Sequence, residues 1–83
     1  METKQAEHIS VRSDTEALRL RRRLRARAQR LGFGLFQQTK LLTAASELAR
    51  NMLDFASGGD ATLSTLREGS RIGLRLVFAD KGP

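Results

Sequence analysis

The sequence contains no cysteine, tryptophan or tyrosine, and its only proline is the last of its 83 residues. Without cysteine, a disulfide scaffold and every thiolate zinc site are excluded, and nothing argues for an oxidising compartment. No uncharged run approaches the roughly 18 apolar residues of a membrane helix, and the polar start of the chain lacks the apolar segment of a signal peptide. We therefore expect a cytoplasmic protein that does not enter the membrane.

The chain is short and basic. Fifteen Lys or Arg against nine Asp or Glu give a net charge of +6, and 40% of the residues are hydrophobic. A chain of this size buries only about 60% of the surface that it exposes when unfolded, so one modest core is expected. The first eight residues are polar, and we expect residues 1–8 to form a flexible tail, with regular structure beginning near Ile9.

The first elements follow this tail directly. Residues 9–12 alternate apolar and polar side chains and predict one short strand. The next four residues, Ser13 to Glu16, have the S-x-x-E form of a capping box, so a helix should begin at Ser13 or Asp14. An apolar stripe then predicts a helix over residues 14–31, which Gly32 can end as a left-handed cap. The stripe consists of Ala17, Leu20, Leu24, Ala28 and Leu31.

A second helix is predicted over residues 36–56, where Gly58 and Gly59 follow as a stop signal. At 100° per residue, one arc of this helix is apolar and the opposite side is polar. The apolar arc contains Leu41, Ala45, Leu48, Met52 and Phe55, and the polar side contains Lys40, Thr43, Glu47, Asn51 and Asp54. The helix should therefore bury one face and leave a polar stripe exposed.

The last third of the chain predicts a β-hairpin. Residues 62–67 favour a strand, residues 68–70 read as a turn, and apolar side chains alternate strictly from Ile72 to Phe78. The order strand, helix, helix, strand, strand predicts an α+β fold in which two helices pack on one face of a small mixed or antiparallel sheet. The chain then stops at residues 80–83, where a strand should become a loop, and this ending is abrupt.

Glu47 and Asn51 are the strongest candidates for chemistry. Their i, i+4 spacing places a carboxylate and an amide side by side on one helical face. An amide oxygen suits Mg²⁺, which takes few protein ligands beside phosphate oxygens, and a neighbouring carboxylate can orient or deprotonate a hydroxyl group. The alternative is that both are solvated helix residues, and the E-x-x-x-N spacing taken alone favours that alternative.

The surrounding residues add a family resemblance. Residues 46–51 (Ser-Glu-Leu-Ala-Arg-Asn) and 77–83 (Val-Phe-Ala-Asp-Lys-Gly-Pro) resemble the N box and the beginning of the D-x-G-x-G box of the GHKL, or Bergerat-fold, ATPases. Residues 31–33, 38–40 and 43–51 are similar to the serine/threonine switch kinases of the anti-sigma-factor regulatory branch, which act in bacterial stress signalling. The resemblance runs from about Ile9 to the end of the chain.

The resemblance implies ATP and Mg²⁺ as cofactors and assigns four residues. Asn51 corresponds to the Mg²⁺ ligand beneath the phosphates, and Glu47 to the acidic residue described as base or orienter. Asp80 corresponds to the aspartate that accepts a hydrogen bond from the exocyclic amine of adenine, and Gly82 to the first glycine of the box. An ionised carboxylate only accepts hydrogen bonds, so it favours adenine over guanine at that position.

The resemblance covers only part of the family's domain. The rest of the glycine box, the lid and the second glycine-rich segment are absent from these residues, so residues 9–83 should form the N-terminal half of a histidine-kinase-like ATPase domain. Phosphoryl transfer depends on positioning and charge neutralisation, so this half should be weakly active or inactive, and whether it is an enzyme stays open. The implied partners are an antagonist or scaffold protein carrying the target Ser or Thr and a sigma-factor regulator. An uncovered sheet edge would also favour self-association.

The first helix supports an alternative function. Seven arginines crowd into a dozen residues, and such a cluster could dock an acidic protein or nucleic acid without any catalysis. They are Arg19, Arg21, Arg22, Arg23, Arg25, Arg27 and Arg30. Because a base-stacking platform needs aromatic residues, nucleic acid is disfavoured, and we expect a solvated or protein-docking face.

Two residue types are expected to be structural or inert. His8 is a lone histidine in the predicted tail and should not bind a metal. The four phenylalanines, Phe33, Phe36, Phe55 and Phe78, should lie in the core.

Overall fold

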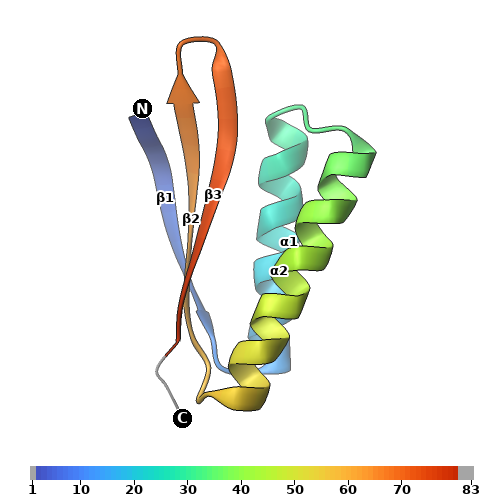
Figure 1. Cartoon of the computed structure of the whole chain (residues 1–83), viewed down its shortest axis with the longest axis vertical. Coiled ribbons are helices and arrows are strands. Elements are labelled where there is room, and N and C mark those ends of the chain that lie inside the picture. The colour runs from blue at the N-terminus through green and yellow to red at the C-terminus, as the bar shows by residue number, and fades with distance from the viewer. Residues whose placement is uncertain (1, 81–83) are drawn as a thin grey trace.

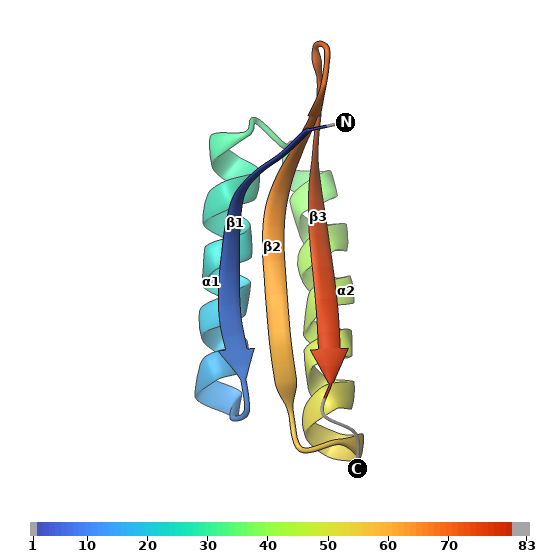
Figure 2. The same cartoon turned by 90° about the vertical axis from the view of Figure 1, so that its left-hand side faces the viewer.

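The computed structural model describes residues 2–80, and side chains from residue 3 to residue 79. The elements in chain order are β1 (Glu2–Val11), α1 (Asp14–Arg30), α2 (Leu35–Phe55), β2 (Gly59–Glu68) and β3 (Arg71–Asp80). Within these residues the strands form one antiparallel sheet in the order β1-β2-β3, and both helices cover the same face (Figures 1 and 2). The predicted two-layer α+β fold is confirmed. No helix in the described part of the chain is long and apolar enough to cross a membrane.

Both helices begin and end within one residue of the predicted positions. The hydroxyl of Ser13 accepts a hydrogen bond from the backbone N–H of Glu16 at 3.2 Å, so the predicted N-cap of α1 is present. Acidic side chains lie in the first turn of α1 and basic ones in the last, which complements the helix dipole. Gly32 follows with a φ of 83°, as a left-handed cap requires.

The predicted start of regular structure near Ile9 is wrong, because β1 begins at Glu2. Its polar first half pairs with the far end of β2, where Glu2 lies opposite Arg67, and the register shifts between Lys4 and Glu7. Backbone pairing does not need apolar side chains on a strand at the edge of a sheet. Because the side chains of this half of β1 are polar, the sequence pattern did not predict that it is a strand.

The core lies between the helices and the helix-facing side of the sheet. The largest fully buried side chains are Leu20 and Leu24 of α1, Leu63 of β2 and Val11 of β1. The apolar stripe predicted for α1 is confirmed at its centre. On α2 the buried residues are Leu42, Ala45, Ala49 and Met52.

The predicted apolar arc of α2 is therefore rotated relative to the observed one. Leu48 is 48% exposed and Phe55 is 77% exposed, because the small side chains of Ala45 and Ala49 let that flank of α2 approach its neighbours instead. The prediction that all four phenylalanines lie in the core is wrong for Phe36 and Phe55. Phe33 and Phe78 are partly buried.

Arg27 corrects the prediction that the arginines of α1 form a solvated face. Its side chain is buried, and its two terminal nitrogens donate to the backbone oxygen of Gln5 at 2.7 Å and to Glu7 Oε1 at 3.0 Å. Glu7 also pairs with Arg23. Gln5 has a φ of 54°, at the irregularity in β1. Arg27 thus holds the irregular part of β1 against α1.

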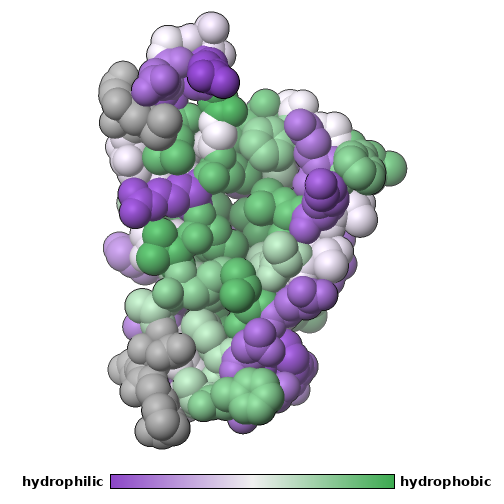
Figure 3. Space-filling view, in the orientation of Figure 1, coloured by the Kyte–Doolittle hydropathy of each residue, from purple (hydrophilic) through white to green (hydrophobic). Residues whose placement is uncertain are grey.

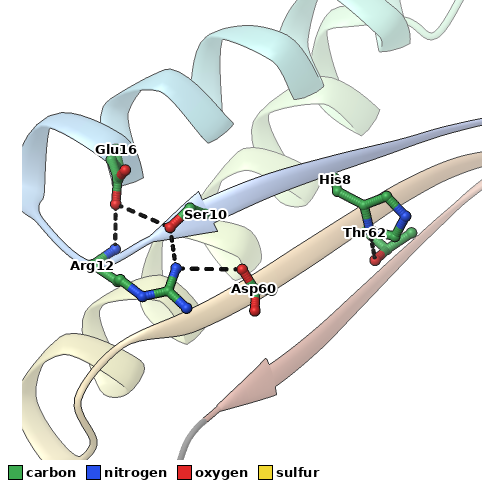
Figure 4. A network of polar contacts seen from close by, with 6 residues as sticks. All are labelled: His8, Ser10, Arg12, Glu16, Asp60 and Thr62. Atoms are coloured by element: carbon green, nitrogen blue, oxygen red, sulfur yellow. Dashed lines mark hydrogen bonds and ion pairs between the residues drawn. The ribbon is translucent and has the colours of Figure 1, made fainter.

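A polar network joins the end of β1 to the start of α1 and to β2 (Figure 4). The backbone N–H of Arg12 donates to Glu16 Oε1 at 2.7 Å, and its guanidinium lies 3.4 Å from Asp60 Oδ1. Earlier in β1, away from this corner, His8 Nδ1 lies 3.0 Å from the hydroxyl of Thr62 and links β1 to β2. The contacts of Arg12 connect the corner where the chain leaves the sheet to α1 and β2.

Replacing Arg27 should destabilise the fold. In Arg27→Met the carbonyl of Gln5 and the carboxylate of Glu7 lose their buried donors, which costs about 1–3 kcal/mol. Arg30→Met removes the same charge from an exposed position of α1 and should change stability by less than about 0.5 kcal/mol. Urea denaturation followed by circular dichroism measures both. Equal unfolding midpoints would contradict a structural role for Arg27.

Gly58→Ala should be far more disruptive than Gly69→Ala, although both glycines have positive φ. A Cβ at Gly58 would lie 2.4 Å from the backbone oxygen of Val11, whereas nothing lies within 4 Å of one at Gly69. Both variants incur the left-handed backbone penalty of about 1–2 kcal/mol. Overpacking adds about 1–3 kcal/mol at Gly58 alone. Thermal unfolding of the two variants tests this, and equal losses would contradict the close approach.

Candidate functional site

A hollow lies between the second half of α2 and β3. It has a volume of about 450 Å³, and its lining is mainly apolar. The lining residues are Leu48, Asn51, Met52, Phe55, Ala56 and Phe78. In Figure 3 apolar side chains cover much of the surface between the sheet and α2 in this view. The hollow is thus an extension of the core that reaches the surface.

The strand register explains why β3 presents apolar side chains to this hollow. Phe78 lies opposite Ala61 and Leu76 lies opposite Leu63, and both β2 residues are fully buried beneath the helices. Partners in an antiparallel pair share a face of the sheet, so Phe78 and Leu76 also face the helices. In the described part of the chain no strand pairs with the outer edge of β3. This side of the core is therefore less covered than the β1 side.

Asn51 lies at the rim of this hollow. Its side chain is exposed and makes no hydrogen bond to any described residue, so its amide oxygen is available to a ligand. Glu47 lies one turn earlier, is also exposed, and is not among the lining residues. At 100° per residue the two side chains leave α2 about 40° apart. Of the two candidate site residues on α2, Asn51 therefore lines the hollow and Glu47 does not.

The two remaining candidates lie at or beyond the end of the described chain. The backbone of β3 ends at Asp80, opposite Gly59, and Phe78 two residues earlier lines the hollow. The side chain of Asp80 and all of Gly82 lie outside the described residues. Their predicted contacts with adenine stay predictions.

The donor set limits which metal the hollow could take. In the described part of the chain no three His, Cys, Asp or Glu side chains cluster closely enough to hold a metal ion. Zinc and calcium sites need three or more such ligands or many oxygens, whereas Mg²⁺ usually keeps several waters and uses substrate phosphates. One free amide oxygen at the rim of a hollow fits magnesium bound together with a phosphate ligand.

Leu48, Phe55 and Phe78, which the sequence pattern predicts to lie in the core, line the hollow instead, and the pattern did not predict this. Phe55 is the most exposed of the three, at 77%. The available signal was the helical spacing of Asn51, which at 100° per residue lies only about 40° from Phe55 at the boundary between the polar side and the apolar arc of α2. Neither the depth of the hollow nor the part played by β3 could be read from α2 alone.

No family model matches the chain, and no solved structure matches it. Over 56 residues the chain is 38% identical to the serine/threonine-protein kinase RsbT of Bacillus subtilis (strain 168). The matched segment is 68% of this chain and 42% of that relative, so the chain spans less than half of the relative's length. The chain is therefore related in sequence, over most of its own residues, to part of a serine/threonine-protein kinase.

Proposed function

We propose that this chain is the ATP- and Mg²⁺-binding segment of a GHKL-type protein serine/threonine kinase of the anti-sigma-factor regulatory branch. The observation that carries the proposal is the position of Asn51, whose free amide lies at the rim of an apolar hollow between α2 and β3. The similarity to RsbT supports the kinase class. On this proposal the target is a serine or threonine on a regulatory partner protein.

The apolar half of the hollow suits a nucleotide base. Phe55 and Phe78 supply aromatic surface, and Leu48 and Met52 complete an apolar wall. The volume of about 450 Å³ lies within the range of about 300–1,000 Å³ that is common for small-molecule sites. The backbone of β3 leads from Phe78 to Asp80, the proposed acceptor for the amine of adenine, and Gly82 would follow where backbone approaches the base.

The polar half of the site suits phosphate and magnesium. Bound Mg²⁺ would neutralise phosphate charge, and the amide oxygen of Asn51 would be its protein ligand. The exposed carboxylate of Glu47, one turn away on the solvent side, can orient a hydroxyl group of a protein that approaches α2 from outside. On this proposal the nucleotide base and the acceptor of the phosphoryl group would lie on different sides of Asn51.

Asn51→Ala should weaken the magnesium-dependent part of ATP binding. We expect an affinity at least about tenfold lower in the presence of Mg²⁺, equivalent to about 1.4 kcal/mol, and no change in EDTA. Thr43→Ala, a polar truncation on the exposed side of the same helix, should leave both values unchanged. Isothermal titration calorimetry on this chain measures them. Equal magnesium dependence in all three proteins would contradict Asn51 as the ligand.

Asp80→Asn should erode the preference for ATP over GTP. The carboxylate only accepts hydrogen bonds, whereas an amide can also donate to the carbonyl group of guanine. Asp60→Asn makes the same chemical change at an exposed position of β2 and should leave the ratio of affinities as it is. Competition between the two nucleotides for a fluorescent ATP analogue gives this ratio. A ratio that is the same in wild type and Asp80→Asn would refute the assignment.

A further inference from the structure

A second hollow lies in the seam between α1 and α2, on the opposite flank of α2 from Asn51. Its apolar lining comes from Ala17 and Leu18 of α1 and from Ala49 and Leu53 of α2. Both alanines are small, which is why the surface is hollow between the two larger leucines. Its volume of about 200 Å³ is below the range of about 300–1,000 Å³ common for small-molecule sites. The hollow therefore fits a protruding apolar side chain better than a free ligand.

Charged residues already paired within the chain form the rim of this hollow. Arg21 donates to the hydroxyl of Ser46 at 3.1 Å, and Arg50 donates to Asp14 at 3.0 Å across the seam. Hydrogen bonding and attraction by Asp14, together with the charge of Asp54, raise the pKa of Arg50 above its ordinary value. These contacts bridge the two helices, so the charges of Arg50 and Asp14 at the rim are paired within the chain.

Two arginines further along α1, outside the lining of the hollow, have no such partners. Arg22 and Arg25 follow the exposed Leu18 by four and seven residues, so the three share one face of α1. Both are exposed, and neither makes a hydrogen bond or ion pair with any described residue. The acidic residues of α1 are Asp14 and Glu16 in its first turn, where Asp14 pairs with Arg50 and Glu16 accepts a hydrogen bond from Arg12, so neither pairs with Arg22 or Arg25. An acidic partner would relieve their mutual repulsion.

The geometry points to a docking site on the α1–α2 seam for an acidic, helical segment of a partner protein. We infer that an apolar side chain of this segment enters the hollow beside Leu18 and that carboxylates one and two turns further along contact Arg22 and Arg25. An apolar anchor with a charged rim is typical of protein interfaces and of helices laid in grooves. Nucleic acid fits less well, since none of the seam-lining residues is aromatic and phosphates make no use of an apolar hollow.

A designed peptide tests this inference independently of the nucleotide site. The probe is a short fluorescent helical peptide rich in glutamate, with two leucines one turn apart, and fluorescence anisotropy measures its binding to this chain. The same peptide with serines in place of both leucines keeps its charge and removes the anchor. A double-stranded DNA oligonucleotide serves as a polyanion without an anchor.

Two pairs of substitutions remove the same charge from different places. Arg22→Gln with Arg25→Gln should weaken binding of the leucine peptide at least about tenfold. Arg67→Gln with Arg71→Gln, on the exposed tip of the β2–β3 hairpin, should weaken it less than about twofold, because exposed charges beyond a Debye length are screened. Leu18→Ser should weaken the leucine peptide and leave the serine peptide unchanged. All of these positions are exposed, and thermal unfolding checks that the variants stay folded.

Four outcomes would overturn the inference. The first is no binding of the leucine peptide by the wild-type chain. The second is an equal loss in both double variants, which would indicate attraction by net charge alone. The third is equal affinity for the leucine and serine peptides. The fourth is DNA binding that is tighter than peptide binding and insensitive to Leu18, which would assign the face to nucleic acid.

Discussion

The structure depends on burying one face of a three-stranded sheet beneath two helices. Leu63 at the centre of β2 is fully buried, and Leu20 and Leu24 of α1 pack into the same layer with no more than 1% of their surface exposed. Each fully buried leucine contributes about 1.5–3 kcal/mol relative to an exposed one. A chain of 83 residues can build only one such layer, so the positions of both helices follow from it.

The coverage of this layer is uneven, and the candidate site arises from that unevenness. In Figure 2 α1 lies behind β1 and α2 lies behind β3. β3 is the sheet edge on that side in the described residues, and around Asn51 the apolar side chains Leu48 and Phe55 of α2 are exposed, whereas Phe78 of β3 is partly buried. An incompletely covered core would weaken a domain with a purely structural role. Here it provides an apolar surface beside the free amide of Asn51.

The arginines of α1 show how one residue type takes two roles on one helix. Arg27 faces the sheet, where it satisfies the backbone of Gln5 and the carboxylate of Glu7. Arg22 and Arg25 face away from the core and have no partner in the described residues. A buried guanidinium needs acceptors, because an unsatisfied buried charge costs several kcal/mol. In Arg27 the two terminal nitrogens have acceptors, whereas the buried Nε makes no hydrogen bond to a described residue. The same chemistry therefore stabilises the fold on one face and is available for recognition on the other.

Local signals in the sequence determined the helices, the hairpin and the order of the elements. The capping hydroxyl of Ser13 and the alternation of apolar side chains from Ile72 to Phe78 each involve only a few neighbouring residues. Such local features can be recognised in the sequence. The i, i+4 pair of Glu47 and Asn51 was visible for the same reason. The polar half of β1 was not, because its pairing is with the backbone of β2 more than fifty residues away.

Only the tertiary structure decided which side chains, apolar or polar, are buried. The pattern of α2 predicted an arc that included Leu48 and Phe55, whereas the buried face keeps Ala45 and Met52 of that arc and adds Leu42 and Ala49 on the other side of it. The burial of Arg27 and the hollow beside Asn51 likewise arise only where separate elements meet. Sequence periodicity defines the faces of each element, but the rotation of one element against another depends on how side chains from distant positions fit together.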